Sequence, residues 1–182
     1  MRIGRWIAGG AVHDGVIRDD AAVPFADGHT VADALAAGLE SLSHIASWAD
    51  DASARPLADV QLLVPVEARS VRDFVAFEEH VEGVSAAIDG ASHVAPEWYQ
   101  APTFYFTNPH TLLADGATVR PPVTQRLDFE LEVAAVIGGV AGHDGRDVAP
   151  ADATSHIFGY TVMNDWSARD VQGREMKVRL GP

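Results

Sequence analysis

The stretch LDFELEVAAVIG, residues 127–138, is the part of the chain on which the fold interpretation depends. With the two-residue period of a β-strand, its carboxylates fall on one face and its large apolar side chains on the other. The acidic face carries Asp128, Glu130 and Glu132. Residues 133–137 are then apolar on both faces, which predicts a strand that enters a core. Neighbouring like charges repel, so partly buried carboxylates in such a row have to be paired, protonated or bound to a cation.

Glu130 and Glu132 have a spacing that suits a cation site. Hard divalent cations such as Mg²⁺ take oxygen ligands. Carboxylates at positions i and i+2 of a strand point the same way and can share one ion. One polar face is also typical of an ordinary strand in an antiparallel sheet. The apolar continuation of the strand favours the cation, and both interpretations stay open on this stretch alone.

The composition argues against several classes of partner and chemistry. The 182 residues are 47% hydrophobic and carry a formal net charge of −13, from 26 acidic and 13 basic residues. This balance argues against nucleic acid and anionic membranes as partners, because no basic patch is present to neutralise phosphates. The lack of cysteine excludes disulfides, thiolate catalysis and cysteine–zinc sites. No apolar run approaches the roughly 20 residues that span a bilayer, and no signal peptide is recognisable, so we expect a cytoplasmic protein.

Residues 1–56 are predicted to form a small β-rich module with one helix. Strand-like segments broken by Gly and Asp occupy residues 1–28, as in a β-meander. Apolar side chains then recur at spacings of three and four, which predicts a helix, and Thr30 and Asp33 have the spacing of a capping pair. The polar run 49–56 ends in proline and is interpreted as a linker. The predicted helix face consists of Val31, Leu35, Leu39, Leu42 and Ile45.

Residues 57–182 are assigned to a second domain. A short apolar strand is predicted at 59–66, and residues 70–83 suit a helix or a strand that turns into one. The aromatic, proline-rich segment 97–110 favours strand and loop over helix. Further expected elements are a Gly-rich turn at 138–147, a short helix near 150–156, a strand at 157–165 and a helix from 167, where Ser167 and Asp170 have capping spacing.

Two acidic positions beyond the strand can take part in chemistry. Asp165 follows Asn164 where a strand ends, which is a rigid place for a ligand, although the same pair is typical of a cap or turn. Asp73 precedes His80 by seven residues, and histidine suits a general base near neutral pH. A single histidine among eight is also an ordinary structural residue.

Arg169 and Gln172 form the last candidate group. Three residues apart, they share one face of the helix expected after Asp165. Arginine can clamp a carboxylate in bidentate fashion, and glutamine can donate to a developing oxyanion. An exposed surface arginine is the alternative interpretation.

The strings LDFELEVAAVIGG and FGYTVMNDWSARDVQ together resemble the fumarylacetoacetate hydrolase family. The second string is the more specific, and the resemblance also covers SVRDFVAFEEHVEG and PTFYFTNPH, so that it spans roughly residues 57–182. It implies an α+β fold, with the small N-terminal β-rich module followed by part of a mixed β-roll of the fumarylacetoacetate hydrolase type. Residues 57–182 would then be the N-terminal portion of the catalytic domain.

The resemblance also implies a metal site and its ligands. It assigns Mg²⁺, Mn²⁺ or Ca²⁺ to Glu130, Glu132 and Asp165, and the spacing of Asp73 from His80 adds Asp73 as a ligand. His80 becomes the catalytic base, and Arg169 and Gln172 become substrate contacts. Asp128 is not a ligand in the family pattern, and we expect it near the site or in a structural bond.

The implied activity is metal-dependent hydrolysis of a carbon–carbon bond in a 1,3-dicarbonyl acid, of the acylpyruvate or fumarylacetoacetate type, in aromatic catabolism. The alternatives are a decarboxylase, isomerase or hydratase of a 2-oxo acid within the same family, or an inactive metal-binding fragment. The expected partners are the small-molecule substrate and a second copy in a homodimer.

The sequence departs from the family pattern at two places. Some members have a glutamate three residues after the histidine, whereas here Glu82 stands at +2, so the acid partner of His80 is Glu79, Glu82 or a residue elsewhere. The chain also ends at VRLGP, before the catalytic lysine and the rest of the β-roll that the family pattern places there. We therefore expect a truncated chain whose open sheet edges pair with another chain.

Overall fold

The computed structural model describes residues 1–178, apart from the side chains of residues 87–89. Gly181 and Pro182, part of the motif that suggested truncation, lie outside the described residues. The chain forms two compact units. The first consists of Met1–Glu67, Leu113–Val119 and Glu130–Asp165, and the second of Ala68–Leu112, Arg120–Phe129 and Trp166–Pro182. Strands and helices occur in both, and the predicted α+β class is confirmed.

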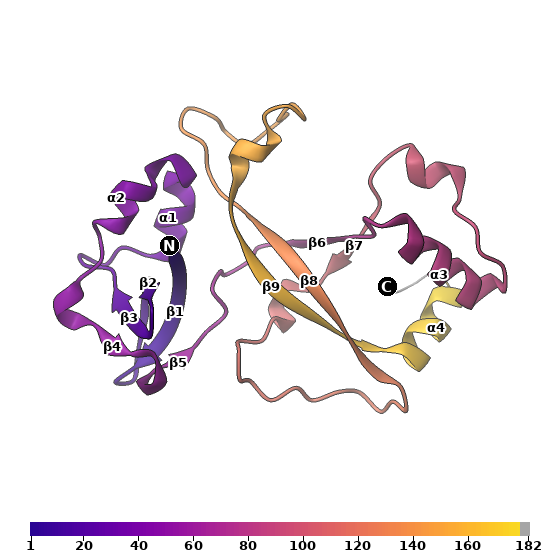
Figure 1. Ribbon diagram of the computed structural model, residues 1–182, viewed down its shortest axis with the longest axis horizontal. Helices are drawn as coiled ribbons and strands as arrows, with labels where there is room; N and C mark the ends of the chain where they lie inside the picture. Colours follow the sequence, from indigo (N-terminus) through magenta and orange to yellow (C-terminus); the bar gives the residue numbers. More distant parts are fainter. Residues whose placement is uncertain (179–182) are drawn as a thin grey trace. The chain divides into compact units, whose positions relative to one another are not determined.

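The first unit contains a five-stranded antiparallel sheet (Figure 1). Its first three strands pair in chain order as the predicted meander, and the positive φ angles of Gly9 and Gly10, 59° and 80°, fit a tight turn between the first two. The sheet order is β4-β3-β2-β1-β5. The strands are β1 (Arg2–Ala8), β2 (Ala11–Arg18), β3 (Ala21–Pro24), β4 (Arg55–Pro56) and β5 (Gln61–Leu62).

The linker predicted at 49–56 is wrong. Ala49 forms a bridge with Phe25, a short 3₁₀ helix follows at η2 (Asp51–Ser53), and β4 pairs with β3 as an edge strand. Proline is tolerated in β4 because an edge strand does not need every N–H. The strand predicted at 59–66 is also shorter than expected, since only β5 pairs with β1.

The predicted helix after Thr30 exists in two parts. The capping box is confirmed, because the Thr30 hydroxyl accepts from the Asp33 N–H at 3.1 Å and the Asp33 carboxylate accepts from the Thr30 N–H at 2.8 Å. Gly38, with φ of 79°, then ends the first helix. Leu39, predicted on the buried face, is 45% exposed. The parts are α1 (Val31–Ala37), η1 (Leu39–Ser41) and α2 (Leu42–Ala46).

The core of the first unit lies between this sheet and these helices. Its main cluster consists of Val16, Val23, Phe25, Ala34, Ile45 and Trp48. Phe158, more than one hundred residues further along the chain, packs against the same cluster. A second cluster around the fully buried Trp6 packs against Leu57 and Leu62.

The second unit contains a two-stranded antiparallel sheet of β6 (Val71–Phe74) and β7 (Phe104–Thr107). The strand-then-helix alternative for residues 70–83 is confirmed, because β6 is followed by α3 (Glu78–Asp89). The strand expected within 97–110 is confirmed as β7, whereas short 3₁₀ helices rather than loop occupy both ends of this segment. The remaining elements are the 3₁₀ helices η4 (Pro96–Tyr99) and η5 (Pro109–Thr111), and α4 (Arg169–Lys177).

The acidic strand of the opening motif is β8 (Leu127–Ile137), which pairs with β9 (Ile157–Ala168) in a two-stranded sheet (Figure 1). The 3₁₀ helix η6 (Ala153–His156) stands where a short helix was predicted. The expectation that residues 133–137 are buried on both faces is wrong. Val133 and Ile137 are 74% and 63% exposed, whereas the face with Glu130 and Glu132 is half-buried.

No helix within residues 1–178 is both long and apolar enough to cross a bilayer.

Candidate metal and substrate site

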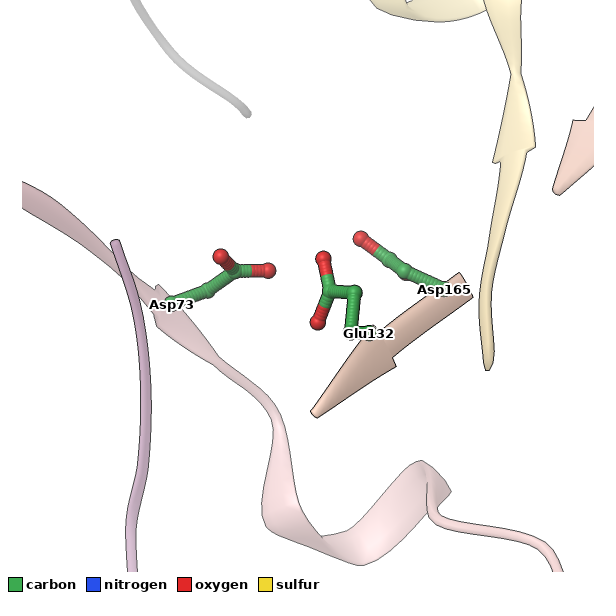
Figure 2. Close-up of side chains that lie close together, drawn as sticks. All are labelled: Asp73, Glu132 and Asp165. Atoms are coloured by element: carbon green, nitrogen blue, oxygen red, sulfur yellow. The ribbon is translucent and has the colours of Figure 1, made fainter. Parts of the chain in front are cut away.

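The first unit brings two of the predicted metal ligands together. Glu132 on β8 and Asp165 on β9 each offer a carboxylate oxygen, and these oxygens lie within 4.8 Å of each other (Figure 2). Both residues are half-buried. Two carboxylates at this separation repel unless a cation or a proton lies between them, so the pair suits a divalent ion.

Glu130 lies two residues before Glu132 on the same half-buried face of β8. Strand alternation explains this placement, since positions i and i+2 share a face. The face therefore presents two glutamates, as the alternation predicted, and the paired strand β9 carries Asp165.

Asp128 has a different role from the two glutamates. Its carboxylate accepts from Arg169 Nε at 2.9 Å and from the Phe129 backbone N–H at 2.9 Å. These bonds to Phe129 and Arg169 lower the pKa of the Asp128 carboxyl. Asp128 was expected near the site or in a structural bond, and the ion pair with Arg169 confirms the structural bond.

Arg169 links Asp128 to Gln172 within the second unit. Both Arg169 and Gln172 lie on α4, and Arg169 Nη1 donates to Gln172 Oε1 at 3.2 Å. Because Oε1 is the acceptor, the amide NH₂ of Gln172 is turned the other way as a donor. The chain Asp128–Arg169–Gln172 thus fixes the orientation of the Arg169 guanidinium and of the Gln172 amide.

The start of α4 is held by Asp170, not by the predicted Ser167 cap. The N-cap residue is Ala168, whose side chain cannot accept a hydrogen bond. The Asp170 carboxylate instead accepts from the Thr124 hydroxyl and from the Gln125 N–H at 3.1 Å. These bonds lower the pKa of Asp170 and fasten the segment before β8 to α4.

Asp73 and His80 lie on consecutive elements of the second unit. Asp73 is half-buried on β6 opposite Tyr105, and His80 is exposed in the first turn of α3. On a helix, residues one or two positions apart do not face each other. Glu79 and Glu82 are one residue before and two residues after His80, so neither shares its face.

One polar group on the same face of the β6–β7 sheet as Asp73 was not among the predicted residues. Thr107 ends β7, and its hydroxyl oxygen is buried without a hydrogen-bond partner among the described residues. Leaving a buried hydroxyl unpaired costs about 1–3 kcal/mol. No sequence pattern could have revealed this, because threonine is an ordinary strand residue.

Comparison with known proteins places the chain in a family. Residues 69–182 match the family model described as fumarylacetoacetate (FAA) hydrolase C-terminal. The chain therefore belongs to the fumarylacetoacetate hydrolase family. Fumarylacetoacetase of Oryza sativa subsp. japonica is 33% identical over 144 residues, which covers 70% of this chain and 33% of that protein. Fumarylacetoacetase of Dictyostelium discoideum is 32% identical over 143 residues, with 69% and 33% covered. The matched region is thus about a third of these relatives' length.

Solved structures agree on the fold. The 5-carboxymethyl-2-hydroxymuconate delta-isomerase from Mycobacterium smegmatis aligns with a TM-score of 0.66 and 26% identity, over 97% of this chain and 59% of that one. The 2-hydroxyhepta-2,4-diene-1,7-dioate isomerase from Mycobacterium marinum aligns with a TM-score of 0.63 and 23% identity, over 97% and 58%. The likeness is not confined to residues 69–182, since it covers nearly the whole chain.

The donor atoms of this site suit a hard cation. Glu132 and Asp165 supply carboxylate oxygens only, and the protein has no cysteine to favour a softer metal. The similar proteins are named as hydrolases and isomerases, and the site of this chain is acidic. Together these findings indicate that the family consists of metal-binding enzymes with small-molecule substrates.

Proposed function

We propose that this chain carries the metal-binding part of a hydrolase that cleaves a carbon–carbon bond in a 1,3-dicarbonyl acid, of the acylpyruvate or fumarylacetoacetate type. The observation that carries the proposal is the closely spaced pair Glu132 and Asp165 in a member of the fumarylacetoacetate hydrolase family. On this proposal residues 1–56 are the N-terminal module and residues 57–182 the N-terminal portion of the catalytic domain.

The proposed metal ligands are Asp73, Glu130, Glu132 and Asp165. Asp73, Glu132 and Asp165 are labelled in Figure 2, and each has a carboxylate oxygen to offer. We propose Mg²⁺, with Mn²⁺ or Ca²⁺ as substitutes, because carboxylates without soft ligands favour these ions. When bound, such an ion polarises a carbonyl group of the substrate.

The catalytic roles fall to residues of the second unit. His80, exposed at the start of α3, takes a proton from water, and the water oxygen attacks the polarised carbonyl carbon. The carbon–carbon bond then breaks, and the departing carbon is protonated. Arg169 and Gln172 hold the negative charge of the substrate carboxylate with the donors that Asp128 orients.

An isomerase is the second candidate. It is favoured by the 26% identity, over nearly the whole chain, to the delta-isomerase from Mycobacterium smegmatis. Decarboxylation and hydration of 2-oxo acids are further reactions that the same donor set can serve. A substrate panel separates these candidates, because hydrolysis removes the 1,3-diketone absorbance, decarboxylation releases CO₂ and isomerisation does neither.

We also propose a homodimer of a cytoplasmic protein. The support is the apolar face of the β8–β9 sheet within the first unit, where large side chains are 63–74% exposed. Two sheets can bury such faces against each other. The face consists of Leu131, Val133, Ile137, Tyr160 and Val162.

A thermal melt with and without Mn²⁺ tests the metal site. Ligand at one hundred times its Kd stabilises the native state by about 2.7 kcal/mol, which raises the Tm of a chain of this size by about 5–10 °C. We expect this shift in the wild type and in the control Glu40→Ala, which changes an exposed glutamate, and none in Glu132→Ala. Equal shifts in all three proteins would refute the assignment of Glu132.

A further inference from the structure

The connection between β8 and β9 holds a histidine ring against one backbone amide. The Gly145 N–H donates to His143 Nδ1 at 2.9 Å. Because the amide only donates, this ring nitrogen carries no proton in the bond and can accept one. A bridge between Val140 and His143 closes the turn, and Gly145 has a φ of 76°, which favours glycine. The backbone thus holds a basic nitrogen at the Gly145 N–H.

Asp144, between these two residues, has its carboxylate folded back along the chain. Its Oδ1 accepts from the Arg146 N–H at 3.0 Å, which is the bond of an Asx turn. This bond turns the carboxyl carbon of Asp144 toward the next nitrogen in the chain, that of Gly145. If that nitrogen attacked the carbon, negative charge would develop on the oxygen that already accepts from Arg146.

The turn is open to water and unshielded by side chains. Residues 141–147 are all exposed. Gly145 has no side chain to cover its nitrogen, and beyond its chain neighbours nothing lies within 4 Å of the place where a Cβ would stand. A nucleophile, a base, an electrophilic carbon and a donor for the developing charge therefore occur together at one accessible place.

We propose that Asp144 is a site of isoaspartate formation, with His143 as the base. The Gly145 nitrogen forms a C–N bond to the Asp144 carboxyl carbon, and its proton passes to His143 Nδ1. One carboxyl oxygen leaves as water, with that proton and one from solvent, and a five-membered imide remains. Water then opens the imide. Attack at one carbonyl restores aspartate, and attack at the other gives isoaspartate.

Isoaspartate changes the course of the main chain in this turn. The chain then runs through the former side chain of Asp144, which makes it one carbon longer. The bonds from Gly145 to His143 and from Arg146 to Asp144 depend on the original spacing, so the modified turn loses both. The inference is independent of the proposed function, because no proposed metal ligand or substrate contact takes part.

Incubation of the folded protein near neutral pH tests the assignment against two other Asp–Gly pairs in the same chain. Asp27 and Asp115 are also exposed and precede glycine. Within residues 1–178, neither Gly28 nor Gly116 donates its N–H to a histidine. We expect Asp144 to convert at least about tenfold faster than either, since a positioned base contributes about 10²–10⁴-fold.

The conversion is read from tryptic peptides by mass spectrometry. Isoaspartate gives a second chromatographic peak of the same mass, and electron-transfer dissociation locates it. The three aspartates fall on different peptides, which are 19–69, 73–126 and 127–146.

The variant His143→Asn separates a base from a structural residue, because the two roles predict opposite changes. The asparagine oxygen can accept the Gly145 N–H, but it takes up no proton near neutral pH. We expect conversion of Asp144 to slow at least about tenfold. A merely structural histidine would leave a looser turn when replaced, and conversion would be equal or faster. His110→Asn, at an exposed histidine of η5, is the matched control and should leave the rate unchanged.

Concentrated urea removes the turn and leaves the sequence intact. The three aspartates should then convert at similar rates, because nothing holds His143 at the Gly145 amide. Equal rates in the folded protein, or an unchanged or faster rate in His143→Asn, would overturn the proposal. A preference for Asp144 that persists in urea would also overturn it, since the preference would then come from the local sequence and not from the folded turn.

Discussion

The backbone N–H of Gly139 donates to the carbonyl of Leu35 at 2.7 Å, which joins the end of β8 to helix α1. The approach is close because Gly38 and Gly139, which meet at this contact, have no side chains. A Cβ at Gly139 would lie 2.4 Å from the Ala36 carbonyl oxygen, and one at Gly38 would lie 2.2 Å from the Gly139 carbonyl oxygen. This glycine contact and the packing of Phe158 join β8 and β9 to the helices and the core of the first unit.

Gly139→Ala should therefore destabilise the protein. The new methyl group would overlap backbone atoms that cannot rotate away, at a cost of about 1–3 kcal/mol. We expect a Tm lower by about 2–10 °C in calorimetry. Gly83→Ala is the control, because its Cβ meets nothing within 4 Å in helix α3 and alanine stabilises a helix by about 0.5–1 kcal/mol. A Gly139→Ala protein with an unchanged Tm would contradict this account of the contact.

Asp128→Asn tests the orientation of Arg169 and Gln172. Asparagine keeps the size of the side chain and loses the charge that holds Arg169 Nε. We expect kcat/KM for a dicarbonyl acid to fall about tenfold, through KM, because a charge-assisted hydrogen bond contributes about 1.5–3 kcal/mol.

The Mn²⁺-dependent rise in Tm should stay the same in Asp128→Asn, since Asp128 does not belong to the proposed metal ligands. Loss of that shift would mean that Asp128 supports the metal site. Asp115→Asn, at an exposed position, is the charge-matched control and should change neither quantity.

The bonds of Asp170 predict a pH-dependent stability. Its pKa is lowered below the ordinary value of 3.8 by the Thr124 hydroxyl and the Gln125 N–H, so folding favours the ionised form. The stabilisation is complete above pH 3.8 and is lost as the pH falls through the lower folded-state pKa. Melting curves from pH 6 to pH 2.5 should show Asp170→Asn less stable than the wild type at pH 6, with the difference in stability shrinking as the pH falls below 3.8. A stability difference that is constant across this range would contradict the role of the carboxylate.

The exposed apolar face of the β8–β9 sheet predicts self-association. Sedimentation should show a dimer of the wild-type chain. Val162→Lys, at a position 71% exposed in the centre of that face, should shift it to monomer. Val12→Lys, at a 56% exposed position on β2, should leave the dimer intact. A wild-type monomer at all concentrations would contradict the proposed homodimer.

Local features of the fold were predictable because the residues that make them are neighbours in the chain. The capping box joins Thr30 and Asp33, three residues apart, and the strand-then-helix order of residues 70–83 follows a local change of period. The row of carboxylates on β8 was likewise readable from strand alternation. The metal ligands, His80 and the substrate contacts assigned from the motifs remain predictions.

The features that sequence reasoning missed all depend on distant partners. Helix α1 ends at Gly38, which packs against Gly139. Strand β4 forms by pairing with the edge of β3. The burial of the Thr107 hydroxyl without a partner among the described residues also depends on the side chains that pack around it.

The sequence by itself determined the α+β class, the family and the division of β8 into an acidic and an apolar face, because these depend on residue order and period. Only the tertiary structure decided which face of β8 is half-buried and that Asp128 belongs to Arg169, forty-one residues away. The physical reason is that period-two alternation separates two faces of a strand without saying what packs on either. The role of each carboxylate on β8 therefore depends on which cation, arginine or other carboxylate the fold places near it.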